Sequence, residues 1–179
     1  SSANDAEQAL ARSKMEQWAE DPNLHGVARH ALISDALKRG DHGQALRITA
    51  QIVSAPGATF EDRLVQLEVL RQLKRKEFWW CLAMLQKQAE AEWSEARLEG
   101  RATDGLGTAA TLLSWLNRRG LASAVVDWSQ RMPGEMPAQV PVRIDLVDAH
   151  YLLRDWKAVK NLTQAEYWGP LDWKRKALN

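Results

Sequence analysis

The sequence predicts an all-α protein built from antiparallel helix pairs. Good helix formers dominate the composition, whereas strand signals are nearly absent, with 2 Phe, 2 Tyr and no alternating run of Val, Ile or Thr. One helix–turn–helix pattern also recurs along the chain. Its clearest copy covers 31–53, where two stretches of apolar residues at helical spacing flank a tight turn at Gly40.

The first predicted helix begins near Asp5, a good N-cap residue, and ends at 21–22. Its opening residues, 4–10, match 40–46 at a shift of 36, with Asp, Gln, Ala and Leu in common. Because 40–46 opens the second helix of a pair, we expect the first helix to be half of a pair whose other helix is missing. The chain is then expected to be a fragment of a longer protein.

The later elements follow from caps, turns and apolar spacing. Thr59 is the predicted N-cap of a helix with Glu61 and Asp62 in its first turn, where the helix dipole favours acidic residues. The stretch 94–107 holds three glycines and is predicted to be an irregular insertion. The predicted units of a single repeat domain over 1–179 are a half repeat over 4–22, pairs over 24–57, 59–93, 105–137 and 140–168, and a terminal helix over 171–179.

The turn positions have a regular spacing. They are Gly40, Lys74, Gly120 and Arg154, which are separated by 34, 46 and 34 residues, and the longer interval contains the predicted insertion. A helix–turn–helix unit with a period of 34 is typical of tetratricopeptide repeats. The chain resembles that family over most of its length, and the resemblance implies a right-handed α-solenoid.

The resemblance has departures. The family's Trp early in the first helix is replaced by Arg or Ala, its small residue in the returning helix is replaced once by Trp79, and two of four turn glycines are lost. Another α-solenoid is therefore the alternative to true tetratricopeptide repeats.

Aligning the units on their turns places mostly apolar residues in four columns that are predicted to be buried between neighbouring helices. The polar Gln66 and His150 are the exceptions. The columns are Leu32, Gln66, Leu112 and Leu146; Ile33, Leu67, Leu113 and Val147; Ala36, Leu70, Leu116 and His150; and Ala45, Trp79, Val125 and Val159.

In such an array the first helices line the concave side, where a partner is expected to bind. The polar residues predicted there carry both signs of charge, which suits a peptide or protein segment better than a chain of phosphates. The predicted partner-binding residues are His30, Ser34, Lys38, Glu68, Arg71, Ser114, Asn117, Arg118, Asp148 and Tyr151. The sequence therefore predicts a scaffold for protein–protein interaction.

Two alternatives stay open. In the first, the chain is a structural spacer of a larger enzyme or envelope assembly with no ligand of its own. In the second, which is less favoured, it is an RNA-binding array like the pentatricopeptide proteins. An RNA-binding array needs a basic groove, whereas Glu68 and Asp148 lie on the predicted face and the formal net charge is only +1. No apolar run is long enough to span a membrane.

No catalytic residue, cofactor or metal site is predicted. His25 and His30 are five residues apart, which misses the spacing of four that places two imidazoles on one helix face for zinc. The single cysteine, Cys81, has no recognisable base beside it and is predicted to lie in the core. Asp145 and Asp148 are interpreted as an acidic pair on an exposed helix face. The sequence indicates neither compartment nor oligomeric state.

Nine tryptophans make the chain tryptophan-rich. Trp79, Trp80, Trp115 and Trp128 fall on or beside the apolar columns and are predicted to fill the core. The other five lie nearer to turns or ends, namely Trp18, Trp93, Trp156, Trp168 and Trp173. If several are exposed together, that patch is the best candidate for an interface.

Overall fold

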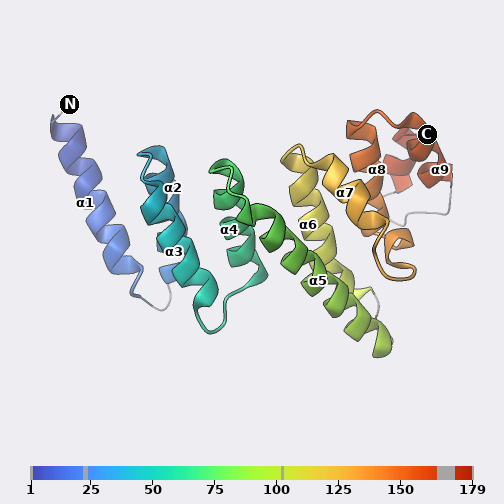
Figure 1. Ribbon diagram of the computed structural model, residues 1–179, viewed down its shortest axis with the longest axis horizontal. Helices are drawn as coiled ribbons and strands as arrows, with labels where there is room; N and C mark the ends of the chain where they lie inside the picture. The colour runs from blue at the N-terminus through green and yellow to red at the C-terminus, as the bar shows by residue number, and fades with distance from the viewer. Residues whose placement is uncertain (1, 22–23, 102, 165–171, 179) are drawn as a thin grey trace. The chain divides into compact units, whose positions relative to one another are not determined.

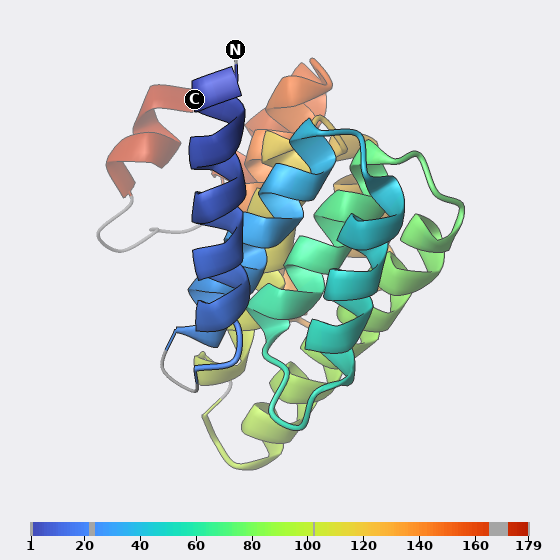
Figure 2. The ribbon, with the colours of Figure 1, turned by 90° about the vertical axis from the view of Figure 1, so that its left-hand side faces the viewer.

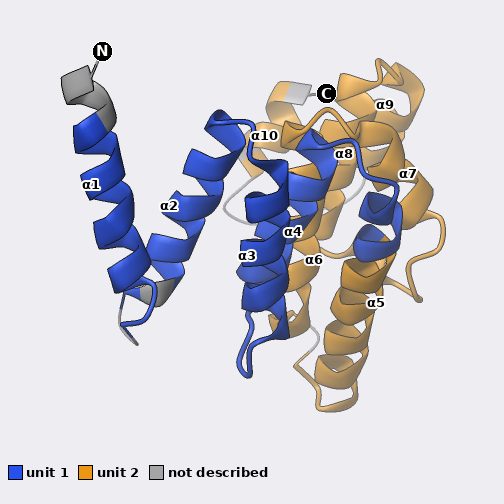
Figure 3. Cartoon of the chain, turned by 60° about the vertical axis from the view of Figure 1, so that its left-hand side comes forward, with its two compact units in different colours: residues 1–82 blue, residues 83–179 orange. Residues whose placement is uncertain are grey.

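The computed structural model describes residues 2–21, 24–101, 103–164 and 172–178. The regular structure in these ranges is entirely helical, which confirms the all-α prediction. The chain divides into two compact units, residues 1–82 and 83–179 (Figure 3). The predicted single repeat domain over 1–179 stays a prediction.

The first unit contains four complete helices and the start of a fifth. These are α1 (Ser2–Trp18), α2 (His25–Lys38), α3 (His42–Ser54), α4 (Phe60–Gln72) and the opening of α5 (Glu77–Leu98). From α1 to α4, each helix packs against the next one along the chain (Figures 1 and 2). The core between them comes from Ala19 directly after α1, one face of α2, one face of α3 and Val69 of α4.

The second unit continues from α5 to the end of the chain. Its elements are η1 (Asp104–Leu106), α6 (Gly107–Arg118), α7 (Ala122–Ser129), η2 (Met136–Ala138), α8 (Val142–Leu152), α9 (Trp156–Gln164) and α10 (Asp172–Leu178). Helix α8 packs against α6, α7 and α9 and is therefore the centre of this unit. Leu113, Val125 and Val147, from α6, α7 and α8, are fully buried.

The four predicted turn positions share one backbone conformation. The φ angle is 74° at Gly40, 51° at Lys74, 73° at Gly120 and 59° at Arg154. At each turn the N–H of the next residue donates to the carbonyl five residues before it, at 2.8–3.0 Å, and the turn residue's own N–H donates to the carbonyl three residues before it. This is the Schellman motif, which ends a helix and satisfies its last carbonyls. The predicted turn positions are confirmed.

The predicted insertion over 94–107 is wrong in its first part. Residues 94–98 continue α5, which has 22 residues where α3 has 13. The helix ends at a fifth turn of the same kind, with φ of 74° at Gly100 and a 2.8 Å bond from the Arg101 N–H to the Ala96 carbonyl. The longer interval between turns 74 and 120 therefore comes mainly from a longer helix.

The predicted columns are buried with one clear exception. Gln66 and His150 are half-buried, and every other column residue except Trp79 is buried. Trp79 is 59% exposed, so its assignment to the core is wrong. Ala45, Val125 and Val159 are almost completely enclosed at the same position, where an indole has no room. Helix α5 instead buries Phe78, one residue earlier, which corresponds to a rotation of about 100° around its axis.

The helix starts agree with the sequence in one case and differ in another. Thr59 caps α4 as predicted, because its hydroxyl accepts from the Asp62 N–H while the Asp62 carboxylate accepts from the Thr59 N–H. The first helix begins at Ser2, three residues before the predicted start at Asp5. The break predicted around 168–170 lies outside the described residues.

Glycine at the two non-glycine turns is expected to stabilise the protein. Lys74 and Arg154 hold a left-handed φ that costs an L-residue about 1 kcal/mol, which glycine avoids. Lys74→Gly and Arg154→Gly should each raise the free energy of unfolding by about 0.5–1 kcal/mol in urea titrations followed by circular dichroism. Lys76→Gly, outside the left-handed region, is the control and should not stabilise. Destabilisation by both turn variants would contradict the shared turn.

Gly105 is expected to tolerate no side chain. A Cβ there would lie 2.7 Å from the Trp93 Cα and 2.8 Å from both the Glu92 carbonyl oxygen and the Ala96 Cβ. Gly105→Ala should therefore lower the free energy of unfolding by about 1–3 kcal/mol, because backbone atoms of α5 must move. Gly107→Ala is the matched control, since its Cβ would meet nothing within 4 Å. Equal stability of the two variants would contradict the close approach of η1 to α5.

Candidate functional site

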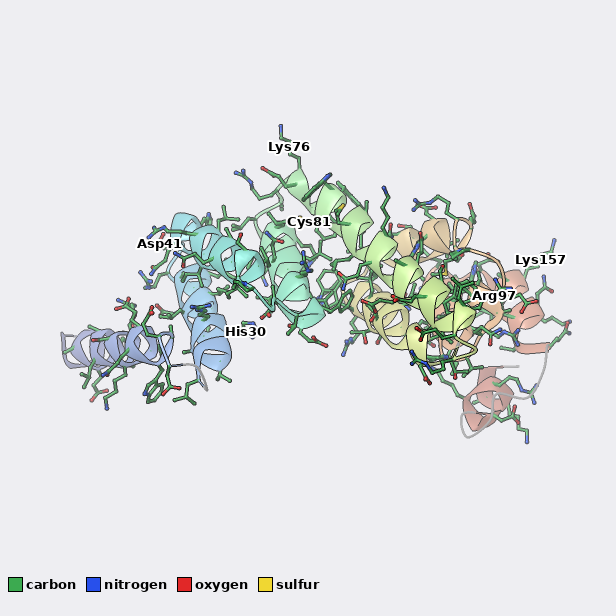
Figure 4. The ribbon with its side chains drawn as sticks, turned by 90° about the horizontal axis from the view of Figure 1, so that it is seen from below. His30, Asp41, Lys76, Cys81, Arg97 and Lys157 are labelled. Atoms are coloured by element: carbon green, nitrogen blue, oxygen red, sulfur yellow. The ribbon has the colours of Figure 1, made fainter. Side chains whose placement is uncertain are left out.

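Three predicted partner-binding residues of the first unit lie along one face of α2. His30, Ser34 and Lys38 are spaced by four residues, so their side chains follow one line along the helix. Ser34 and Lys38 are exposed, and His30 is half-buried. Figure 4 labels the His30 side chain on α2. This stripe is accessible over its second half.

The two predicted residues on α4 contact each other. Arg71 Nη2 donates to Glu68 Oε1 at 2.9 Å, and the hydrogen bond raises the pKa of the Arg71 guanidinium. The same carboxylate oxygen accepts from Gln72 Nε2 at 2.7 Å. A partner at this position therefore meets a paired group rather than an isolated charge.

Asp62 joins α4 to α2 and was not among the predicted site residues. His30 Nε2 lies 3.3 Å from Asp62 Oδ1. Burial raises the pKa of Asp62, but hydrogen bonds from the Thr59 backbone and hydroxyl and the contact with His30 outweigh it, so the pKa lies below its ordinary value. The ionised carboxylate thus holds the cap of α4 and the His30 ring together. A cavity of about 440 Å³ beside them is lined by the start of α2, the end of α3 and the loop before α4.

The predicted residues of the second unit lie on α6 and α8, which pack against each other. Asn117 Nδ2 donates to the Asp145 backbone carbonyl at 2.8 Å, and its Oδ1 is buried without a partner among the described residues. Arg118 is exposed and Ser114 is half-buried. Asn117 therefore ties α6 to α8, whereas Arg118 Nε donates to the Ser114 carbonyl of its own helix at 3.3 Å.

The face of α8 also contacts the last helix. Lys174 of α10 donates to Asp148 Oδ2 at 2.7 Å, so an element of the chain itself already meets this carboxylate. Tyr151, 48% exposed, packs edge-on against the exposed Trp156 of α9, with ring centroids 5.4 Å apart. The five predicted residues of each unit thus share neighbouring helices. A groove continuous over all ten stays a prediction.

Asp145 corrects the interpretation of the acidic pair as an exposed helix face. Asp145 and Asp148 are both half-buried rather than exposed. Burial, and secondarily the charge of Asp148, raise the pKa of Asp145 to about 7, although Lys174 and Arg118 act in the opposite direction. Local sequence carries no signal for this burial, because Asp145 lies in the first turn of α8, where an exposed carboxylate is ordinary.

The tryptophans divide differently from the prediction. Trp115 and Trp128 are buried as expected, and the Trp128 indole N–H donates to Glu90 Oε1 at 2.7 Å. Trp93, placed near an end by the sequence, is only 2% exposed inside α5. Trp80 is 68% exposed beside the exposed Trp79, so both core assignments on this turn of α5 are wrong. The side chains of Trp168 and Trp173 lie outside the described residues.

Few arrangements among the described residues offer reaction chemistry. No group of three or more His, Cys, Asp or Glu side chains there is placed to hold a metal ion. Cys81 is half-buried rather than in the core, and burial followed by the charge of Glu77 raises the pKa of its thiol. None of the helices within the described ranges is both long and apolar enough to cross a membrane.

Comparison with known proteins adds no assignment. No protein-family model matches the chain, and the searches of curated proteins and of solved structures return no match.

Asp145 makes stability depend on pH. Its pKa is raised from 3.8 to about 7 on folding, so the folded protein resists ionisation and loses stability as pH rises from about 4 to 7. Asp145→Asn removes this loss. The variant should exceed the parent by about 1–3 kcal/mol in the free energy of unfolding at pH 8, with little difference at pH 4.

Urea titrations across this range measure the effect. Asp148→Asn should move the pH window downward, because it removes the repelling charge and releases Lys174 toward Asp145. A difference between parent and Asp145→Asn that does not change with pH would contradict the raised pKa of Asp145.

Proposed function

We propose that the chain is a helical-repeat binding module that holds a peptide or protein partner along its first helices. The observation that supports this is the shared turn at Gly40, Lys74, Gly120 and Arg154. Because each turn fixes where a first helix ends, equivalent positions of α2, α4, α6 and α8 are presented in the same register. The helix pairs are proposed to stack as a right-handed α-solenoid resembling tetratricopeptide repeats.

The character of these positions favours a protein partner. Exposed or half-buried groups of both signs occur on them, namely the cations of Lys38 and Arg118 and the carboxylates of Glu68 and Asp148. A phosphate chain needs a uniformly basic surface, whereas a peptide backbone with mixed side chains can pair with both signs and with hydroxyls. A protein partner is therefore the first proposal, and no catalytic role is proposed.

A structural spacer is the second candidate. The specific observation in its favour is that several polar groups of this face already have partners within the chain, as in the pairs Glu68–Arg71 and Asp148–Lys174. A spacer needs no accessible polar group, so such self-pairing suits it.

Photo-crosslinking separates these candidates. A benzophenone amino acid placed at Ser34 of α2 or Ser114 of α6 should yield discrete protein adducts in the cells from which the chain comes. Gln51 of α3 and Ser123 of α7, both exposed on returning helices, are the matched control positions and should not yield the same adducts.

Each other outcome decides against the proposal. Adducts that a nuclease removes would favour the RNA-binding alternative. Absence of position-specific adducts at both first-helix sites, while the control proteins are folded and expressed equally, would favour the spacer.

A further inference from the structure

Helices α3, α4 and α5 enclose a groove on the side of the returning helices. Its cavity of about 280 Å³ lies entirely within the first unit. The lining residues are Leu46, Thr49 and Ala50 of α3, Gln66 and Leu70 of α4, and Arg75, Glu77, Trp80 and Cys81 at the start of α5. This volume suits one or two side chains rather than a whole small-molecule ligand, whose pockets range from about 300 to 1,000 Å³.

The groove has the chemistry of a docking site for a helix. Leu46, Ala50 and Leu70 supply apolar wall, and the indole of Trp80 stands at its edge with 68% of its surface exposed. Exposed tryptophan at the edge of an apolar pocket is the arrangement that concentrates binding energy in interfaces. On α3, Thr49 and Ala50 lie three and four residues after Leu46, so this wall of the groove follows one face of the helix. A partner helix can place side chains at the same spacing against that face.

The charges around the groove select the partner. Arg75 and Glu77 form an ion pair at 2.8 Å and offset each other. The exposed Lys74 and Lys76 flank Arg75, and the exposed Arg47 follows Leu46 along α3. Figure 4 shows the Lys76 side chain extending away from the ribbon at the turn into α5. Among the described residues none of these three cations forms an ion pair, so the rim carries a positive excess.

Trp80 and its neighbour Trp79 are exposed because of how α5 sits on the first unit. The helix buries Phe78 and Leu82, which leaves the two indoles outside. Trp79 packs edge-on against Phe78, with centroids 4.9 Å apart, and is therefore held in place. Two large apolar side chains in succession, next to an apolar cavity, form a patch that a monomeric soluble protein rarely leaves uncovered.

We propose that this groove binds an acidic amphipathic helix of a partner protein, with an apolar side chain in the cavity against Trp80 and carboxylates facing Arg47, Lys74 and Lys76. None of the ten predicted partner-binding residues lines the groove, so this proposal is tested independently of the binding proposed along the first helices. Cys81 contributes to the wall through its protonated thiol, whose Sγ lies 4.0 Å from Gln66 Oε1.

The chain provides its own reporter, because Cys81 is its single cysteine and lines the groove. The probe is a capped 18-residue helical peptide with leucines along one face and glutamates on the other. It should slow the alkylation of Cys81 by iodoacetamide in a saturable manner. The same peptide with lysines in place of the glutamates should bind at least about tenfold more weakly, because it meets like charge.

Variants test whether peptide binding depends on the Trp80 indole and on the rim cations Lys74 and Lys76. Trp80→Ala should weaken binding of the acidic peptide about tenfold or more in fluorescence anisotropy. Trp156→Ala, which removes another exposed indole in the second unit, should leave the affinity unchanged. The double variant Lys74→Glu, Lys76→Glu should bind the acidic peptide more weakly and the lysine peptide more tightly. Circular dichroism confirms that each variant is folded.

Three outcomes would overturn the proposal. The first is equal affinity for the acidic and the lysine peptide. The second is an alkylation rate that neither peptide changes. The third is an alkylation rate that falls with the protein's own concentration in the absence of peptide, which would show that a second copy of the chain covers the groove.

Discussion

A left-handed residue after each first helix determines how the helix pairs form. At Gly40, Lys74, Gly120 and Arg154 a positive φ lets two N–H groups reach back to the last turn of the helix and close it. The next helix then starts within two or three residues, so it must return beside the one before it. Burial follows from this geometry, because the residues a fixed number of positions before the turn face the returning helix.

One hairpin departs from this arrangement in a consistent way. In α4 and α5 the first column contains Gln66 and the fourth contains Trp79, and neither residue is buried. A tryptophan at a position where the other hairpins enclose Ala or Val forces α5 to present Phe78 instead, and the rotation leaves Trp79 and Trp80 in solvent. The same rotation brings Trp80 and Cys81 to the edge of the cavity beside Gln66. The irregular hairpin therefore lines this groove with an exposed indole and a thiol.

The sequence predicted the fold better than the surfaces. The period of 34 identified the turns even at Lys74 and Arg154, where no glycine marks them, because the apolar columns on either side keep their distance from the turn. It did not reveal that α5 continues to Leu98, since glycines at 100, 105 and 107 read as irregular chain. Gly100 in fact closes a helix, and Gly105 permits close contact with α5.

The candidate site is likewise predicted only in part from the sequence. Sequence spacing placed polar residues on the first helices but could not tell which of them pair within the chain. The contact of Lys174 with Asp148 joins residues 26 positions apart, and the Lys174 charge that lowers the pKa of Asp145 comes from the same distant helix. Such long-range proximity leaves no trace in local periodicity. The exposure of Trp80 is not predicted either, because a bulky apolar residue beside a buried column is more often buried too.

The most direct test of the shared turn is solution NMR of the backbone at residues 74 and 154. The φ-dependent three-bond coupling and the Cα and Cβ shifts should report a left-handed conformation at Lys74 and Arg154, as at Gly40 and Gly120. Couplings across hydrogen bonds should connect the Arg75 and Asp155 N–H groups to the carbonyls of Leu70 and His150. Right-handed or extended values at both Lys74 and Arg154, without these couplings, would show that the two residues do not share the turn of Gly40 and Gly120.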